Sequence, residues 1–137
     1  MFLLDTNVVS ELRKAARAHP HVRRWAEGIS PAALYLSAIS LLELEIGVLL
    51  VERRDPRQGA VLRTWLEERV LPAFDDRILA IDTAVARRCA ALHIPNPCSD
   101  RDALIAATAL LHGLTVVTRN VTDFQSTGAK LLNPWKE

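Results

Sequence analysis

The stretch Phe2-Leu3-Leu4-Asp5-Thr6-Asn7, near the start of the chain, decides the fold that we expect for the rest of it. Residues 2–4 form a short apolar run, as a buried strand does, and the polar residues 5–7 lead into a helical pattern that reaches about Lys14. A buried strand followed at once by a helix is typical of α/β proteins. The opening of the chain therefore predicts that fold class.

The same alternation continues outward from this stretch to the end of the chain. Short apolar runs that indicate strands lie at residues 34–36, 77–81, 115–118 and, as an edge strand, 131–132. The helical patterns between them cover a segment that includes Trp25 and ends near Gly28, and residues 40–50, 62–72, 82–92 and 101–111. We expect a doubly wound, mostly parallel central sheet of four or five strands flanked by helices, with residues 1–137 as a single domain.

The composition is that of a folded globular chain. Half of the 137 residues are apolar and 24% are charged. The formal net charge of +1 argues against binding of nucleic acid by charge alone, although 14 of the 17 basic residues are arginines, which suit phosphate partners. The start of the chain lacks a basic leader, and no apolar run reaches the roughly 20 residues that span a bilayer. We therefore expect a cytoplasmic protein that does not enter a membrane.

Two cysteines, Cys89 and Cys98, are too few for a disulfide framework. They lie close in sequence to His93, but the three residues lack the paired spacing and the fourth ligand of a structural zinc site. We expect free thiols at these positions.

Four acidic residues fall where an apolar run gives way to a turn or a helix: Asp5, Glu43, Asp102 and Asp123. In an open parallel sheet all such junctions lie along one edge, outside the carboxyl ends of the strands. Carboxylates gathered there repel one another unless a cation joins them. A hard divalent ion with oxygen ligands, Mg²⁺ or Mn²⁺, is the natural choice. The sequence thus predicts a metal site.

Each of these acids also has a purely structural interpretation. Asp5 is placed to cap the helix after the first strand, and Glu43 follows Ser40 at the spacing of a capping box. Asp102 in a first helical turn favours the helix dipole, and Asp123 suits a cap before a turn. The joint placement of all four is what favours a site, because positions that cap helices in this fold also line the crevice where ligands bind.

Neighbouring hydroxyl and amide side chains are candidates to orient the carboxylates or metal-bound waters, with ordinary turn chemistry as the alternative. They are Thr6, Asn7, Ser40, Thr118 and Asn120. The remaining acids, among them Glu45, Glu52 and Glu67, are expected on the surface beside arginines. The tryptophans at positions 25, 65 and 135 show no repeating interval, so we expect core or interface anchors rather than a platform for stacking bases.

Four blocks of sequence, in this order, resemble the PIN-domain ribonucleases, and in particular the VapC-type toxins of bacterial toxin-antitoxin pairs, including their FitB-like branch. The blocks are Phe-Leu-Leu-Asp-Thr-Asn at 2–7, Ser-Leu-Leu-Glu-Leu-Glu-Ile-Gly at 40–47, Asp-Ala-Leu-Ile-Ala-Ala-Thr-Ala at 102–109 and Thr-Arg-Asn-Val-Thr-Asp-Phe at 118–124. Together they span nearly the whole chain, and the resemblance implies a PIN-like α/β fold.

The resemblance also implies a site and an activity. The family's metal-binding acids match Asp5, Glu43, Asp102 and Asp123, and the polar residue after its last strand matches Thr118. The family's third acid directly precedes the Ala-Leu-Ile-Ala-Ala helix, which selects Asp102 and leaves Asp100 as a cap or an auxiliary. The implied protein is an endoribonuclease that needs Mg²⁺ or Mn²⁺, forms a homodimer and is inhibited by a cognate antitoxin.

Two other functions are weighed against this one. An aspartyl-nucleophile phosphatase also has an aspartate after its first strand, but it wants a second aspartate at the position of Asn7. A non-catalytic PIN-fold module that binds RNA or protein is the second alternative. The four intact acids argue against that module, and a metal-dependent nuclease assay separates the two readings.

Overall fold

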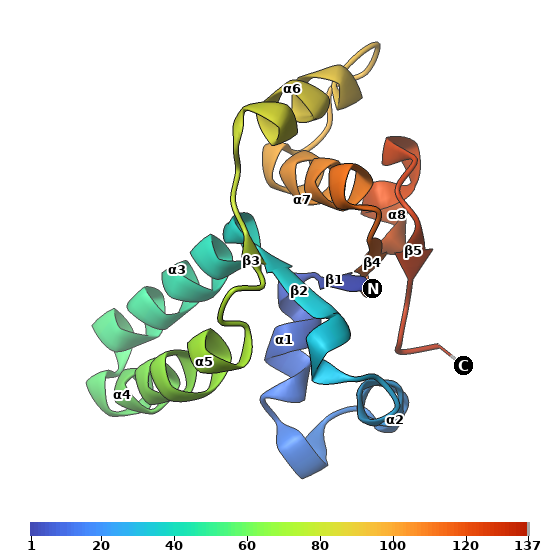
Figure 1. The fold of residues 1–137 in the computed structure, drawn as a ribbon. Coiled ribbons are helices and arrows are strands. Elements are labelled where there is room, and N and C mark those ends of the chain that lie inside the picture. The colour runs from blue at the N-terminus through green and yellow to red at the C-terminus, as the bar shows by residue number, and fades with distance from the viewer. Residues whose placement is uncertain (137) are drawn as a thin grey trace.

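The first strand, β1 (Phe2–Leu4), lies in the middle of a five-stranded sheet. The computed structural model of the protein describes residues 1–136, and its strands follow the order β3-β2-β1-β4-β5 (Figure 1). The other strands are β2 (Leu34–Ser37), β3 (Ile78–Leu79), β4 (Thr115–Val117) and β5 (Leu131–Leu132). All neighbouring strands run parallel, which confirms the predicted sheet; β3 is shorter than expected.

The strand order reverses at β1, and this reversal positions the site. From β1 the chain moves outward through β2 to β3 and then returns to add β4 on the other side of β1, with Phe2 paired to both Leu34 and Thr115. Crossover connections that leave adjacent strands on opposite sides open a crevice at the carboxyl ends of those strands. That crevice lies beyond β1 and β4, where Asp5 and Thr118 follow.

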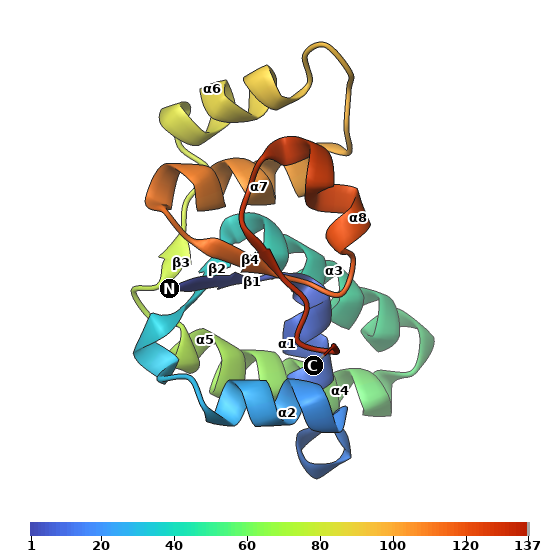
Figure 2. The ribbon, with the colours of Figure 1, turned by 90° about the vertical axis from the view of Figure 1, so that its right-hand side faces the viewer.

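Helices cover both faces of the sheet (Figure 2). Below it in that view lie α1 (Thr6–Leu12), α2 (Pro20–Glu27), α4 (Pro56–Trp65) and α5 (Leu71–Ala73), and above it lie α6 (Thr83–Leu92), α7 (Asp100–His112) and α8 (Val121–Phe124). The long helix α3 (Ala38–Arg54) forms a hairpin with α4 on one side (Figure 1). None of the helices within residues 1–136 is both long and apolar enough to cross a membrane.

Alternate residues of the central strands serve the two faces. Leu4 and Val117 join a core cluster with α1, α3 and the segment 66–74, whereas Leu3 and Val116 pack with α7 and Phe124. Successive side chains of a strand point to opposite faces, so the covered residues of β1 and β4 must be apolar on both faces; Thr115, which opens β4, is only half-buried. This is why residues 2–4 form an uninterrupted apolar run.

The start of α3 differs from the prediction. Ser37, not Ser40, caps this helix, and its hydroxyl accepts a 3.0 Å hydrogen bond from the backbone N–H of Ile39. β2 passes into the helix without a loop, so the cap falls on the last residue of the strand. Glu43 therefore lies in the second turn, and the alternative interpretation of Ser40 and Glu43 as a capping box does not hold. The helix also continues past Leu50 to Arg54.

The helical hairpin of α3 and α4 is closely packed. A Cβ atom at Gly59 would lie 2.4 Å from the Cα of Glu52, so only glycine permits the helices to approach this closely. The helix predicted over residues 62–72 begins earlier, at Pro56, and ends one residue later, at Ala73. A π-helical segment spans Leu66–Val70, and Pro72 lies in the first turn of α5, where a missing N–H is tolerated.

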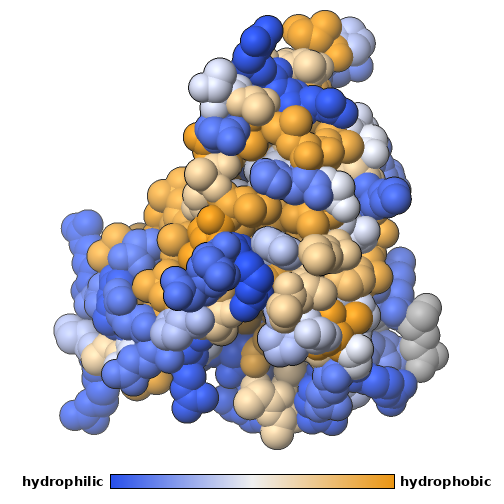
Figure 3. All heavy atoms as spheres, in the orientation of Figure 1, coloured by the Kyte–Doolittle hydropathy of each residue, from blue (hydrophilic) through white to orange (hydrophobic). Residues whose placement is uncertain are grey.

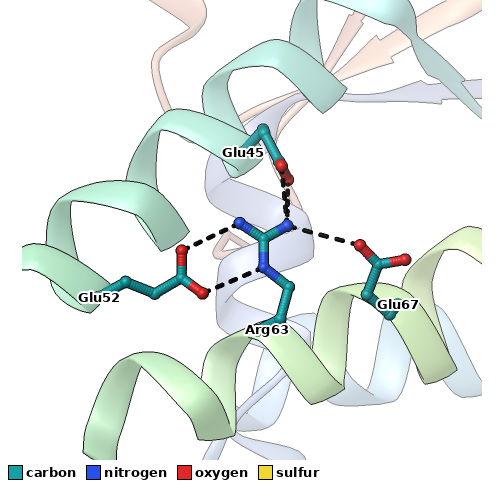
Figure 4. Close-up of polar contacts among 4 residues, drawn as sticks. All are labelled: Glu45, Glu52, Arg63 and Glu67. Carbon is teal, nitrogen blue, oxygen red and sulfur yellow. Dashed lines mark hydrogen bonds and ion pairs between the residues drawn. The ribbon is translucent and has the colours of Figure 1, made fainter. Parts of the chain in front are cut away.

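One arginine joins three of the acids that were expected on the surface (Figure 4). Arg63 of α4 lies 2.7 Å from Glu45 and 3.1 Å from Glu52, both on α3, and 3.5 Å from Glu67. Hydrogen bonds to Glu52 and Glu45 raise the pKa of Arg63. The pairing ties the two arms of the hairpin together on its solvent side.

Candidate active site

A pocket of about 530 Å³ opens at the carboxyl ends of β1 and β4, at the reversal of strand order. Its lining combines acidic, basic, polar and aromatic side chains from both ends of the chain. The lining residues are Asp5, Thr6, Asn7, Ser10, Glu11, Arg13, Lys14, Glu43, Asp102, Arg119, Asn120 and Trp135. Three of the four predicted acids, from three separate elements, thus share one pocket.

Asp5 is held rigidly at the end of β1. Its Oδ1 accepts a 2.8 Å hydrogen bond from the N–H of Thr6, and its Oδ2 accepts from the Thr118 hydroxyl at 2.8 Å and from the Asn7 amide at 3.3 Å. The residue is only 7% exposed. Burial raises the pKa of Asp5, and the charge of Glu43 raises it further, while the three hydrogen bonds act in the opposite direction. The carboxylate is oriented, yet it lacks a compensating positive charge.

Glu43 approaches Asp5 from α3. Its Oε1 accepts a 2.7 Å hydrogen bond from the Thr6 hydroxyl, and its Oε2 lies 3.6 Å from the Arg101 guanidinium. Thr6 therefore links two acids, since its backbone binds Asp5 and its side chain binds Glu43. The Arg101 side chain is half exposed, so a stronger cation can displace it from Glu43.

Asp102 enters the pocket from the first turn of α7. Burial, and then the negative charges of Asp5, Asp123 and Glu43, raise the pKa of Asp102 from 3.8 to about 6. The four predicted acids are therefore close enough to act on one another. A cation in the pocket would relieve this repulsion.

The two remaining acids lie differently. Asp123, in the short helix α8, exerts its charge on Asp102 but does not line the pocket. Asp100 points away: its side chain is 90% exposed and lies 3.5 Å from the His93 ring. Helix geometry separates Asp100 and Asp102, because residues two apart face different sides of a helix.

Four of the five predicted orienting residues are at the site. Thr6, Asn7 and Asn120 line the pocket, and the buried Thr118 hydroxyl donates to Asp5. Ser40 is not there: its buried hydroxyl donates to the Leu4 carbonyl at 3.4 Å and so fastens α3 to β1. Ser40 therefore has a structural contact instead of a place in the pocket.

Sequence reasoning missed the basic and aromatic side of the pocket. Arg13 and Lys14 extend the helix face that carries Thr6, and their spacing of seven and eight residues from it is a signal that could have located them. Arg119 directly follows Thr118, so its place could also have been inferred. Trp135 carries no local signal, because it reaches the pocket only through the pairing of β5 with β4.

The donor set suits a hard divalent cation, since carboxylate oxygens are the ligands that Mg²⁺ and Mn²⁺ prefer. Asp5, Glu43 and Asp102 share one pocket, and burial first, then the charges of the neighbouring acids, raise the pKa of Asp102; a cation would offset the second cause. As the side chains lie, no three residues of histidine, cysteine or acidic type within positions 1–136 converge on a single ion position. Small side-chain rotations would therefore accompany binding.

A doubly wound parallel sheet with an acidic pocket at the reversal of its strand order defines the molecule as an α/β protein with a site at the carboxyl ends of its central strands. The chain belongs to the PIN domain family, whose model matches residues 2–130. This confirms the resemblance drawn from the four blocks of sequence.

Known proteins of similar length support that assignment. The chain is 37% identical over 141 residues to the VapC ribonuclease Y4jK of Sinorhizobium fredii, covering 99% of both chains. Its fold is similar to the crystal structure of FitAcB from Neisseria gonorrhoeae, with a TM-score of 0.91 and 36% identity over 100% of both chains. A toxin-antitoxin complex from Klebsiella pneumoniae is also similar, with a TM-score of 0.71 and 28% identity over 98% of each chain.

Proposed function

We propose that this protein is a metal-dependent endoribonuclease that acts as the toxin of a toxin-antitoxin pair in the cytoplasm. The observation that carries the proposal is the meeting of Asp5, Glu43 and Asp102 in one pocket that basic residues border. The likeness to a VapC ribonuclease over the whole chain supports RNA as the substrate.

The polar residues of the site have two roles: some would hold the metal, and others orient the carboxylates. Asp5, Glu43 and Asp102, with Asp123 behind them, would hold Mg²⁺ or Mn²⁺, which when bound makes water nucleophilic at neutral pH and offsets charge on the phosphate. Thr118 and Asn7 fix the orientation of Asp5 through their hydrogen bonds.

The basic residues of the pocket have a separate role. Arg13, Lys14 and Arg119 line the pocket beside the acids and would attract the RNA backbone. Single-stranded regions are the accessible target, because their bases can leave the stack.

The test is cleavage of RNA by the purified protein free of any partner. We expect cleavage with Mg²⁺ or Mn²⁺, loss of cleavage in excess chelator and recovery when the metal is restored. The Asp5→Asn variant should be inactive under all three conditions. Cleavage that persists in chelator, with Asp5→Asn as active as the parent, would contradict the proposal.

A groove beside the acidic pocket supports an antitoxin tail as the inhibitor. Two hollows, of about 160 and 370 Å³, share Arg13 and Trp65. The first lies between α1, the strands β1 and β2, and the segment 65–74, and the second lies between α1, α3 and α4. Apolar side chains such as Leu12, Leu62 and Phe74 line them, and the second also reaches Glu43. An extended tail could bury apolar side chains here and place a guanidinium against the acids, since charge alone is screened by salt.

An apolar face supports the homodimer. In Figure 3 apolar atoms gather over the middle of the molecule, where α3 begins and α7 lies above it. Large apolar side chains are exposed on both helices, among them Leu42 at 45% and Leu111 at 41%. Extended apolar patches on soluble chains mark interaction sites, and a symmetric dimer would cover this one.

A further inference from the structure

The aromatic residue of the acidic pocket, Trp135, has no role in holding a metal. It follows β5 and is partly buried: one side of the indole packs against the core cluster that contains Leu4 and Val8, while the residue also lines the pocket. The guanidinium of Arg119 lies over the ring, 5.4 Å from its centroid. An indole backed by the core and covered by one exposed arginine is a flat surface that a ligand can share.

The backbone around the indole is fixed. The N–H of Trp135 donates to the Asn133 side chain at 2.9 Å, and the Asn133 amide donates to the Arg119 carbonyl at 3.5 Å. On the other side, the carbonyl of Trp135 lies 2.9 Å from Nδ1 of His21 on α2. These contacts fix the main chain at residue 135 and leave the face of the indole unused.

The same network connects the aromatic wall to the acids. The backbone N–H of Arg119 donates to the Asn7 side chain at 3.3 Å, and the amide of Asn7 donates to Asp5. The residue before Arg119 is Thr118, whose hydroxyl also donates to Asp5. The indole and its arginine therefore form one wall of the pocket whose other wall would hold the cation.

We propose that Trp135 and Arg119 form a subsite that stacks the nucleobase next to the phosphate that is cut. The inference rests on the proposed function and goes beyond it by assigning residues that select an unstacked base. Indole and guanidinium planes both stack on nucleobases, and every base offers a flat face. Arg119 is exposed, so it can move to lie on the far side of a base or to contact the adjoining phosphate.

The test removes the nucleobase from the RNA as well as the indole from the protein. A short single-stranded RNA with one cleavage site is compared with versions in which each nucleotide flanking the cut is abasic. We expect the parent protein to lose about tenfold in kcat/KM at one flanking position, the size of one stacking contact. Trp135→Leu should show that loss on intact RNA and no further loss on the abasic RNA. Trp135→Phe, which retains an aromatic face, should keep most of the base dependence.

A matched variant controls for folding. Trp25 packs edge to face on Phe2, with ring centroids 5.3 Å apart, and does not line the acidic pocket. Trp25→Leu should therefore keep the full ratio between intact and abasic RNA, whatever it does to stability. If Trp135→Leu keeps that ratio as well, the indole does not touch the base and the subsite is rejected while the nuclease stands.

Measurements of RNA binding show whether the subsite, the nuclease activity or both have failed. Fluorescence anisotropy with the same intact and abasic RNAs needs no cleavage. If no RNA is cut but the parent binds intact single-stranded RNA more tightly than RNA with abasic nucleotides, and Trp135→Leu loses that preference, stacking of a base on Trp135 stands and the nuclease is rejected. If the parent neither cuts RNA nor binds intact RNA more tightly than abasic RNA, both the nuclease and the subsite are rejected.

Discussion

Asp100 and Asp102 are two residues apart in one helical turn, yet only Asp102 lines the acidic pocket, while Asp100 faces solvent beside His93. The same substitution, aspartate to asparagine, can therefore be compared at the two positions. Asp102→Asn should lower RNA cleavage by more than about 100-fold, because removing a ligand costs more than disturbing a residue behind it. Asp100→Asn should keep most activity. Equal losses of activity and of metal affinity by calorimetry would show that the assignment is wrong.

The raised pKa of Asp102 sets the pH dependence of metal binding. Below about pH 6 this carboxyl is protonated, and a cation must displace the proton, so affinity for Mg²⁺ should rise up to about pH 6 and level off above it. Titration calorimetry from pH 5 to 8 checks this. In the Asp102→Asn variant, the affinity for Mg²⁺ should rise less steeply with pH. If its pH profile matches that of the parent, the proton that Mg²⁺ displaces belongs to another group.

The raised pKa of Asp102 also affects folding stability, which should fall with rising pH where metal affinity rises. The pKa of Asp102 is higher in the folded protein than the 3.8 of an unperturbed carboxyl, so the folded state holds the extra proton between those values. The metal-free protein should therefore lose stability as pH rises from about 4 to about 6. Denaturant unfolding across this range checks the direction, and added Mg²⁺ should offset the loss at the upper end.

At the scale of elements, two helical glycines have different reasons to be glycine: one is required by close packing, and the other is not. Gly59 lies against the backbone of Glu52 where α3 and α4 meet, whereas a Cβ at Gly47 in α3 would have no neighbour within 4 Å. Gly59→Ala should destabilise the protein by about 1–3 kcal/mol or more, because the helices must separate. Gly47→Ala should stabilise it by up to about 1 kcal/mol. Urea denaturation midpoints measure both, and similar shifts in the two variants would contradict the close packing at Gly59.

At the scale of the whole molecule, the groove, the acidic pocket and the apolar face together predict the assembly with an antitoxin. We expect a symmetric dimer whose RNA cleavage is blocked when an antitoxin tail occupies the groove beside α1. Hydrogen exchange should then show protection around Asp5, Glu43 and Asp102, and sedimentation should give the mass of a complex built on two copies of this chain. Full inhibition without protection of these segments would point to a remote mechanism.

The sequence by itself determined the fold class and singled out Asp5, Glu43 and Asp102, the three predicted acids that line the pocket. Apolar runs, caps and glycines are local signals, so the strand after Met1, the alternation that follows it and the end of α7 at Gly113, with φ of 67°, could be predicted without coordinates. The same signals placed Asp5 after the first strand and Asp102 in a first helical turn, and the family resemblance named them as a set with Glu43 and Asp123.

Only the tertiary structure decided which side chains share the pocket. The pairing of β5 with β4 brings Trp135 into the pocket that Asp5 lines, and no periodicity in the sequence records that pairing. The start of α3 shows the same limit at a smaller scale: both Ser37 and Ser40 can cap a helix, and the end of β2 chose Ser37, leaving Ser40 to bind the β1 backbone. Local patterns fix what a residue can do, whereas packing fixes which partner it meets.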